Sequence, residues 1–253
     1  MGILSKFELT GKKAVVTGSA RGIGQAVAIA LAEAGADVAL IDQNSSAETE
    51  ELIKEIGRDV FSFQANVADP GQVADTFAKI EERFGRVDIL FNNAGIAIPV
   101  PAEEMSFEVW REVLSVNLDA SFLVAQAAGK IMIKHGGGSI VNTASMSATI
   151  VNYPQPQVNY NASKAGVVHM TKSLACEWAQ YNIRVNSISP GYVGSIMSLR
   201  EPEERKVIWL DRTPMKRMCE PEELQGLVVF LASEASSFMT GSDVIIDGGY
   251  SCY

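Results

Sequence analysis

A tyrosine and a lysine four residues apart, Tyr160 and Lys164, have the spacing in this sequence that most directly suggests chemistry. Residues four apart share one face of an α-helix, where an ammonium group can lie near a phenol and favour its ionised form. The pKa of a free tyrosine is about 10, and a cation that lowers it creates an acid/base that works near neutral pH. No other Tyr-x-x-x-Lys occurs in the chain. The pair therefore predicts a proton-transfer site.

A second group of residues has the pattern of a phosphate-binding turn. Gly18, Gly22 and Gly24 follow an apolar, strand-like run and open an alanine-rich helical pattern. Glycines let the backbone approach a pyrophosphate, and the N-terminus of a helix supplies unpaired N–H groups and partial positive charge. The spacing is Gly-x-x-x-Gly-x-Gly rather than the more familiar Gly-x-Gly-x-x-Gly. We expect a dinucleotide to bind at this turn.

The choice between NAD and NADP depends on two charged residues with opposite preferences. Asp42 ends the second predicted strand, where a carboxylate accepts hydrogen bonds from the adenosine ribose and repels a 2′-phosphate. Arg21, inside the glycine loop, favours NADP because its guanidinium can pair with that phosphate. Asp42 carries more weight because its charge would sit beside the 2′-position. The sequence therefore predicts NAD.

Short β-rich runs alternate with helical patterns along nearly the whole chain, and these elements must position the candidate residues. Strands are predicted at 14–17, 37–42, 60–65, 87–92, 139–143, 183–187 and 244–246. Helices are predicted at 22–34, 47–56, 70–84, 107–134, 159–181 and 221–231. The alternation implies right-handed crossovers and a parallel sheet with helices on both faces. No linker or internal repeat interrupts the pattern, so residues 1–253 are expected to form one α/β domain.

One segment departs from this regular alternation. Residues 193–218 contain two prolines and many charges around an apolar centre at Ile208-Trp209-Leu210. Such a segment reads as an insertion carrying short helices, and insertions of this kind often cover a binding site. We therefore predict a substrate lid here.

Taken together, these motifs closely resemble the short-chain dehydrogenase/reductase family, with a likeness that runs from Gly11 to Gly249. The matching residues are Thr17–Gly24, Asn92–Gly95, Asn117, Ser145, Tyr160, Lys164 and Pro190-Gly191. The resemblance implies a Rossmann-type, doubly wound parallel sheet of about seven strands in the order 3-2-1-4-5-6-7. It also implies hydride transfer with a nicotinamide cofactor and, usually, a homotetramer.

The resemblance assigns four catalytic residues. Ser145 would hydrogen-bond the reacting oxygen, and Tyr160 would take or give its proton. Lys164 would lower the pKa of the tyrosine and bind the nicotinamide ribose. Asn117 would bend its helix and position a water that links Lys164 to bulk solvent.

The same resemblance assigns the cofactor contacts. The implied residues are Gly18, Arg21, Gly22, Ile23, Gly24, Asp42, Asn66, Val67, Asn93, Ala94, Gly95, Tyr160, Lys164, Pro190, Gly191, Val193 and Ser195. Two of them depart from the usual family pattern. Ser195 stands where a threonine usually meets the carboxamide, and it keeps the hydroxyl. Asn66 stands where an aspartate is common, and its amide still offers a donor and an acceptor.

The stretch between Ser145 and Tyr160 bears on the substrate because it borders the substrate in this fold. It is rich in neutral polar side chains and carries no charge. Such a lining suits a polyhydroxylated neutral molecule, because a missing hydroxyl would leave a buried amide unpaired. The predicted substrate contacts are Ser145, Ser147, Asn152, Gln157 and Tyr160. The stretch also resembles family members that act on sugar alcohols and ketoses, such as arabinitol, galactitol and sorbose enzymes.

Two other kinds of function stay open at this point. A 3-oxoacyl-carrier reductase or a keto-deoxy-sugar-acid dehydrogenase would need a basic patch for its anionic substrate, and Arg200, Arg205 and Lys206 near the predicted lid could form one. A cofactor-binding sensor without turnover would be a different class of protein. The intact catalytic set speaks against the sensor, because a protein without turnover has no need of it.

The overall composition limits the remaining partners. A net charge of −9 argues against nucleic acid or an anionic membrane as the main partner. Cys176, Cys219 and Cys252 are widely spaced, which suits reduced thiols in the cytoplasm. His135 and His169 are isolated from other ligand types, so no metal site is expected.

Overall fold

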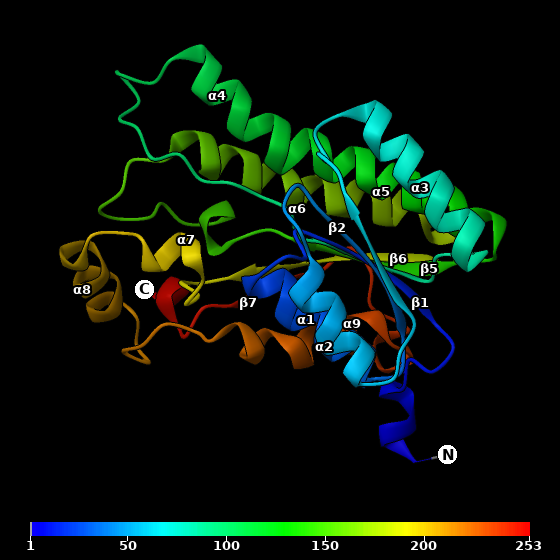
Figure 1. The fold of residues 1–253 in the computed structure, drawn as a ribbon. Helices are drawn as coiled ribbons and strands as arrows, with labels where there is room; N and C mark the ends of the chain where they lie inside the picture. Colours follow the sequence, from blue (N-terminus) through cyan, green and yellow to red (C-terminus); the bar gives the residue numbers. More distant parts are fainter. Residues whose placement is uncertain (1) are drawn as a thin grey trace.

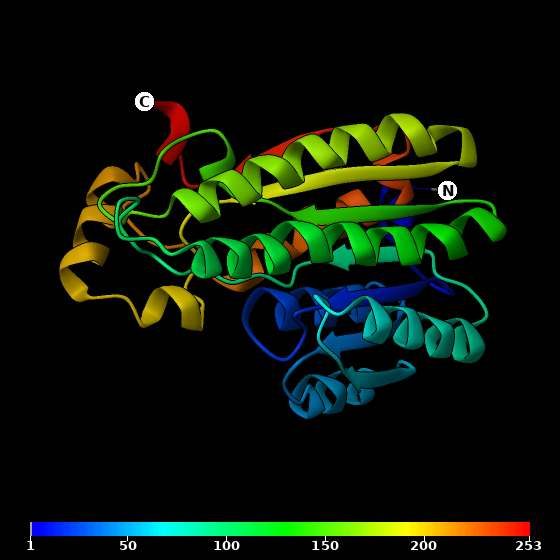
Figure 2. The ribbon, with the colours of Figure 1, turned by 90° about the horizontal axis from the view of Figure 1, so that it is seen from above.

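A computed structural model describes residues 2–253, apart from the side chain of Met197. At its centre is a seven-stranded parallel sheet in the order β3-β2-β1-β4-β5-β6-β7, and the strands lie side by side in Figure 2. The strands are β1 (Lys13–Thr17), β2 (Asp37–Asp42), β3 (Val60–Gln64), β4 (Ile89–Asn92), β5 (Gly138–Thr143), β6 (Ile183–Pro190) and β7 (Asp243–Ile246). The predicted fold class and strand order are confirmed.

Helices cover both faces of the sheet, as the alternation of elements requires. One face carries α3 (Pro70–Phe84), α4 (Phe107–Leu114), α5 (Ala120–Lys134) and α6 (Val158–Trp178). The other carries α1 (Gly22–Glu33), α2 (Ala47–Glu55) and α9 (Gln225–Ala232) (Figure 1). Each layer encloses its own apolar core between helices and strands.

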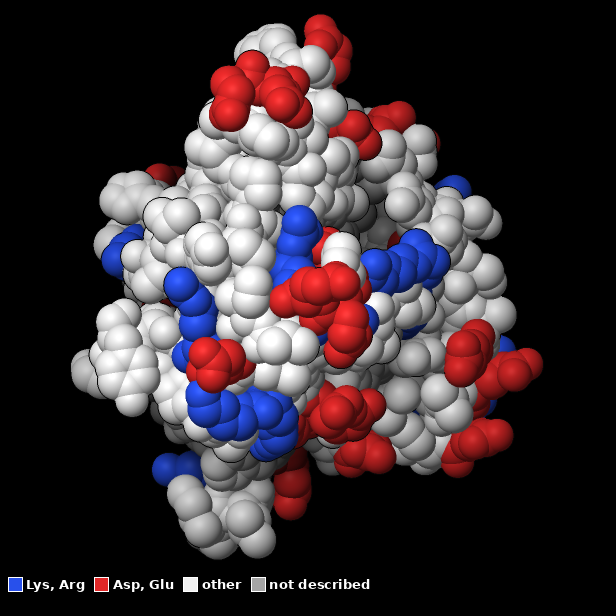
Figure 3. All heavy atoms as spheres, turned by 90° about the vertical axis from the view of Figure 1, so that its left-hand side faces the viewer, with Lys and Arg blue, Asp and Glu red and all other residues white. Residues whose placement is uncertain are grey.

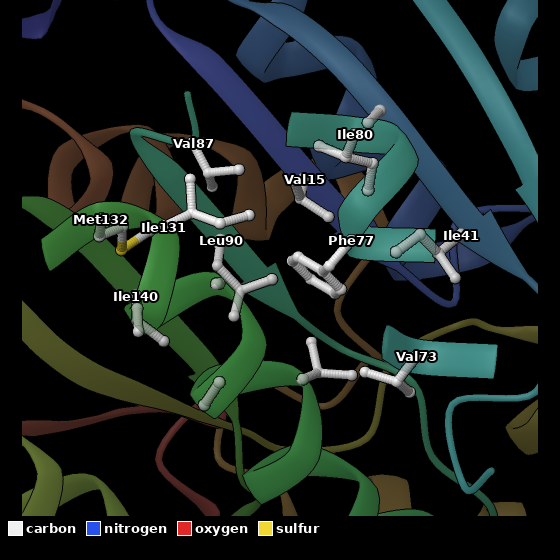
Figure 4. Close-up of a cluster of buried hydrophobic side chains, with 14 of the residues drawn as sticks. Val15, Ile41, Val73, Phe77, Ile80, Val87, Leu90, Ile131, Met132 and Ile140 are labelled. Carbon is white, nitrogen blue, oxygen red and sulfur yellow. The ribbon is translucent and has the colours of Figure 1, made fainter. Parts of the chain in front are cut away.

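The core on the α3–α6 face shows how strand alternation builds the sheet. Val15, Ile41 and Leu90 come from three different strands and point to the same side, where Phe77 of α3 packs among them (Figure 4). All four side chains are buried. Their neighbours along the strands pack against α1 and α9 on the opposite face. Because both faces are buried, the strands are held rigidly and their carboxyl ends are fixed in space.

The helix predicted at 107–134 is interrupted. α4 ends at Leu114, residues Ser115–Asp119 form one π-helical turn, and α5 begins at Ala120. Asn117 lies in this turn with both of its side-chain polar groups bonded to the backbone of Ile96. These contacts join the turn to a segment 21 residues away, and π turns of this kind occur frequently at functional sites.

Two short helices lie in the 193–218 segment, as the sequence predicts for an insertion. α7 (Ile196–Leu199) and α8 (Glu203–Arg212) sit beyond the carboxyl ends of the strands, close to the C-terminus (Figure 1). Trp209 of α8 is only 3% exposed, so this segment is anchored to the domain. Across the described residues, no helix is both long and apolar enough to span a bilayer.

Candidate active site

The candidate residues gather at the carboxyl ends of the strands, on both sides of the point where the strand order reverses. β1 lies between β2 and β4, so the chain leaves β1 toward one side of the sheet and later returns to the other. Thr17, the last residue of β1, accepts hydrogen bonds at its Oγ1 from the N–H groups of Asn93 and Ala94. Open α/β sheets bind their ligands in the crevice at such a point.

The glycine loop after β1 is shaped for close approach of backbone. A Cβ on Gly24 would lie 2.0 Å from the carbonyl oxygen of Gly18, which no side chain tolerates. Gly22 has a φ of +59°, in the region that favours glycine. The side chain of Asn93 donates to the carbonyls of Thr17 and Gly18, which ties the loop to β4.

The N-terminus of α1 fits an anionic cofactor. Arg21 occupies the N-cap position in extended conformation, and no side chain caps the helix. The first N–H groups of a helix lack partners within it, so an uncapped end with a glycine loop before it is ready to bind phosphate. The predicted residues Gly22, Ile23 and Gly24 form this first turn. They would hold the pyrophosphate of a dinucleotide.

Asp42 and Arg21, the two residues predicted to choose between NAD and NADP, differ in their surroundings. The Asp42 carboxylate accepts hydrogen bonds from the N–H groups of Ala20 in the glycine loop at 3.0 Å and of Asn44 at 2.8 Å. These contacts fix a negative charge beside the loop. The side chain of Arg21 is exposed.

Other predicted cofactor residues follow the carboxyl ends of β3 and β6. Asn66 and Val67 follow β3, and Asn66 Oδ1 accepts from the N–H of Ala68. Pro190 ends β6 and Gly191 follows it, packed against Asp247. Ser195 comes within 3.7 Å of the position that a Cβ on Gly22 would take. This last contact places the segment with Val193 and Ser195 against the glycine loop, although about 170 residues of sequence separate them.

Ser145, Tyr160 and Lys164 come together between β5 and α6. Ser145 follows β5, and Tyr160 and Lys164 lie one turn apart on α6. Lys164 is buried, and its ammonium donates to the carbonyl of Thr143 at 2.7 Å. Its Nζ lies 5.7 Å from the centre of the Tyr160 ring. The predicted pairing of lysine and tyrosine on one helix face is therefore present.

The expected lowering of the Tyr160 pKa is not found. Burial raises the pKa of Tyr160, and a hydrogen bond with Ser145 opposes this only in part. Burial also lowers the pKa of Lys164 to about 8. Both shifts have the same cause, because burial disfavours the charged form of each group. The spacing of Tyr160 and Lys164 in the sequence carries no information about the burial of either group.

Asn117 joins the catalytic helix to the loop after β4. Besides its two bonds to Ile96, its Nδ2 donates to Ser163 Oγ at 3.0 Å. Its Oδ1 and Lys164 Nζ both lie near the backbone of Gly95. Asn117 and Lys164 thus approach the same backbone segment, and the role of Asn117 in proton relay remains a prediction.

A pocket opens beside Ser145 and Tyr160. The predicted residues Ser147, Asn152 and Gln157 line it, together with Ala97, Pro99, Met146, Gln155, Gly191, Tyr192, Ser198, Glu201 and Trp209. The buried side chains bond one another. Ser147 Oγ donates to Asn152 Oδ1 at 2.5 Å, and Gln157 Nε2 donates to the same oxygen at 3.1 Å.

Gln155, Tyr192, Glu201 and Trp209 line the pocket but were not among the predicted substrate contacts. The signals available were the amide-rich stretch for Gln155, the position next to Pro190-Gly191 for Tyr192, and the apolar centre of the predicted lid for Trp209. None of these signals shows which side chains meet, because the contacts join three segments that are distant in sequence.

Comparisons with known proteins agree with this arrangement. The family model described as enoyl-(acyl carrier protein) reductase matches residues 18–251. Sorbose reductase of Candida albicans is 43% identical, over 99% of this chain and 90% of that protein. A Yarrowia lipolytica protein named as a probable NADP-dependent mannitol dehydrogenase is also 43% identical, over 99% of this chain and 91% of that protein. D-arabinitol 2-dehydrogenases and galactitol 2-dehydrogenases are further relatives.

A solved structure gives the same result for the fold. A short-chain type dehydrogenase/reductase from Mycobacterium marinum is 42% identical, covers 100% of both chains and has a TM-score of 0.97. The resemblance inferred from the motifs is confirmed. This chain belongs to the short-chain dehydrogenase/reductase family of NAD(P)-dependent oxidoreductases.

Proposed function

We propose that this protein transfers a hydride between NAD(H) and a secondary alcohol or ketone, with a sugar alcohol and its ketose as the substrate pair. The observation that carries the proposal is the pocket beside Ser145 and Tyr160, which is lined by buried neutral amides and hydroxyls. Neutral donors and acceptors suit a neutral polyhydroxylated molecule. The names of the relatives, sorbose reductase and mannitol dehydrogenase among them, support the same substrate class.

The charges around the pocket support a neutral substrate over an anionic one. Arg205 forms an ion pair with Glu201, and Glu201 itself lines the pocket. Lys206 donates to the carbonyl of Leu199 at 2.9 Å and lies 3.4 Å from a carboxylate oxygen of Glu203. On this side of the molecule, basic and acidic side chains are intermixed (Figure 3). Two of the three basic side chains that could have received an acyl-carrier or sugar-acid substrate, Arg205 and Lys206, are therefore paired with acidic neighbours.

The residues would share the chemistry as follows. When bound, the nicotinamide ring supplies or accepts the hydride. Ser145 would hydrogen-bond the carbonyl or alcohol oxygen of the substrate. Tyr160 would give its proton to that oxygen during ketone reduction and take it back during alcohol oxidation. A protein that only sensed the cofactor would not need this pairing of Ser145 and Tyr160.

The 193–218 segment is proposed as the substrate lid. Ser198, Glu201 and Trp209 of this segment line the pocket, so it closes one side of the site. A cytoplasmic homotetramer without a resident metal remains part of the proposal, on the family resemblance and the composition.

Asp42 is proposed to select NAD. Replacing it with alanine is expected to weaken NAD and relieve repulsion of the NADP phosphate, so the ratio of kcat/KM for NAD to that for NADP should fall by about ten-fold. Measuring kcat/KM for both cofactors with one substrate tests this. Arg21→Ala is the matched variant, and it should shift the ratio toward NAD. Wild-type protein that prefers NADP would show that Arg21 outweighs Asp42.

A substrate panel tests the proposed function as a whole. Pentitols and hexitols are supplied with NAD and NADP, and ketoses with NADH and NADPH, while the nicotinamide absorbance is followed. We expect turnover of at least one polyol–ketose pair. Turnover of keto-acyl thioesters or keto-deoxy sugar acids, without turnover of any polyol, would contradict the substrate assignment.

A further inference from the structure

Tyr192 lies at the centre of the hydrogen-bond network in the pocket. Its phenol oxygen is 3.2 Å from Asn152 Nδ2 and 3.1 Å from Gln155 Nε2. Its ring stacks on that of Trp209, with the centroids 4.0 Å apart and the planes 8° from parallel. These contacts fix both the ring and the hydroxyl oxygen.

Trp209 sets the direction of the hydrogen bonds. An indole N–H can only donate, so the Gln155 atom 2.9 Å from Trp209 Nε1 is the oxygen Oε1. The amide nitrogen of Gln155 then faces Tyr192 and donates to it. Asn152 is oriented in the same sense, because its Oδ1 accepts from Ser147 and its Nδ2 faces Tyr192. Tyr192 is therefore the acceptor in both of these bonds.

The one hydrogen of the Tyr192 hydroxyl is not donated in either of these hydrogen bonds. Burial raises the pKa of Tyr192, so the phenol keeps that hydrogen through the neutral range. Tyr250 packs edge-on against Tyr192, with the ring centroids 5.4 Å apart. Its buried hydroxyl has no hydrogen-bond partner within 3.5 Å among the described residues, although it lies close enough to raise the pKa of Tyr192 further. Tyr192 lines the same pocket as Ser145 and Tyr160. A fixed, protonated donor is therefore present in the substrate pocket.

We propose that Tyr192 donates this hydrogen to a substrate oxygen other than the one that meets Ser145 and Tyr160, which makes Tyr192 a specificity-determining residue for hydroxylated ketones. The proposal rests on the proposed function and deepens it. Gln155 and Trp209 are positioning residues, since they act by keeping the Tyr192 hydrogen directed away from the Gln155 amide. The lid helix α8 thereby contributes to specificity through the indole N–H of Trp209.

The test compares reduction of three ketones, 2-butanone, 3-hydroxy-2-butanone and a ketohexose, by wild-type protein and Tyr192→Phe. Phenylalanine keeps the ring that stacks on Trp209 and removes only the hydroxyl. The ratio of kcat/KM for a hydroxylated ketone to that for 2-butanone should fall by about three- to ten-fold, as the loss of one hydrogen bond predicts. Tyr250→Phe is the matched control, and it should leave this ratio unchanged.

A second variant tests the direction of the bonds while Tyr192 stays in place. In Gln155→Glu, an ionised carboxylate accepts from both Trp209 and Tyr192, so the phenol hydrogen turns toward the protein. We expect the ratio to fall as it does in Tyr192→Phe, and to recover as the pH is lowered and the new carboxyl becomes protonated. The dissociation constant of NADH and the thermal unfolding midpoint are measured for each variant, to separate specificity from cofactor binding and folding.

The outcomes of the two proposals are distinguishable. Failure of every ketohexose in the wild-type protein, with a Tyr192-dependent preference for 3-hydroxy-2-butanone, would reject the sugar substrate and support the donor role. Equal losses on all three ketones in Tyr192→Phe, or a weakened NADH affinity with an unchanged ratio, would overturn the donor role whichever polyol is used. A ratio that is unchanged in both Tyr192→Phe and Gln155→Glu would overturn it as well.

Discussion

Replacing Tyr160 with phenylalanine is expected to lower kcat by about 10²–10⁴-fold in both directions, the range for loss of a positioned acid/base. The substitution removes the hydroxyl that is assigned to proton exchange and keeps the aromatic ring. Binding of NADH should therefore change little, which fluorescence titration of the protein measures. Tyr153→Phe is the matched control, since Tyr153 is 52% exposed and lies seven residues upstream. Activity of Tyr160→Phe within a few-fold of wild type would contradict the assigned mechanism.

The same tyrosine should give the two directions opposite pH profiles. Because burial raises the pKa of Tyr160, the phenol is protonated at neutral pH and is ready to donate to a ketone. Alcohol oxidation needs the phenolate, so its kcat/KM should rise with pH through the alkaline range, while that of ketone reduction should fall. Loss of charge on Lys164, whose pKa is about 8, falls within this range. An oxidation rate that declines between pH 7 and 9 would contradict this assignment.

Ser145→Ala is expected to reduce kcat/KM by about 10²–10³-fold, as loss of a donor to a reacting oxygen does in other enzymes. In this structure the Ser145 hydroxyl donates to Ser147 Oγ at 3.0 Å, because Ser147 uses its own hydrogen on Asn152. The hydrogen of Ser145 must therefore turn to the substrate oxygen when the substrate binds. Steady-state kinetics of Ser145→Ala, with folding checked by circular dichroism, measures the loss.

Ser147→Ala is the informative comparison for this prediction. It removes the acceptor of the Ser145 hydrogen and leaves Ser145 free to donate to the substrate. We therefore expect a smaller loss than in Ser145→Ala. Equal losses in the two variants would show that the serines act as one structural unit rather than as a donor and its support.

Local patterns in the sequence were enough to predict the sheet and its helices. The glycine loop, the helix that follows it and the carboxylate at the end of β2 follow from spacing within about thirty residues. The order of the strands came from the family resemblance. Strand and helix ranges agree within a few residues, and the main exception is the π turn at Ser115–Asp119. That turn depends on contacts between Asn117 and Ile96, which no local pattern contains.

The pocket shows a second limit of sequence reasoning. Asn152 and Gln157 are predicted to contact the substrate, and they do line the pocket, but their polar groups also bond other side chains. Trp209 meets Gln155 across 54 residues, and Tyr192 meets Asn152 across 40. Such partners are set by tertiary packing, and so is the burial that reverses the expected pKa shift of Tyr160.

Two kinds of chain segment form the site, one for the cofactor and one for the substrate. The glycine loop and Asp42 lie at the ends of strands in a sheet whose two faces are buried. The fold itself therefore fixes the positions of the glycine loop and Asp42. Most of the side chains that surround the substrate pocket come from the loop and short helices at 146–157 and 196–212, which add no strand to the sheet. Changes in these two segments replace no residue of a sheet strand or of the glycine loop. Substitutions in these segments can therefore change the substrate during evolution while the residues that bind the cofactor stay the same.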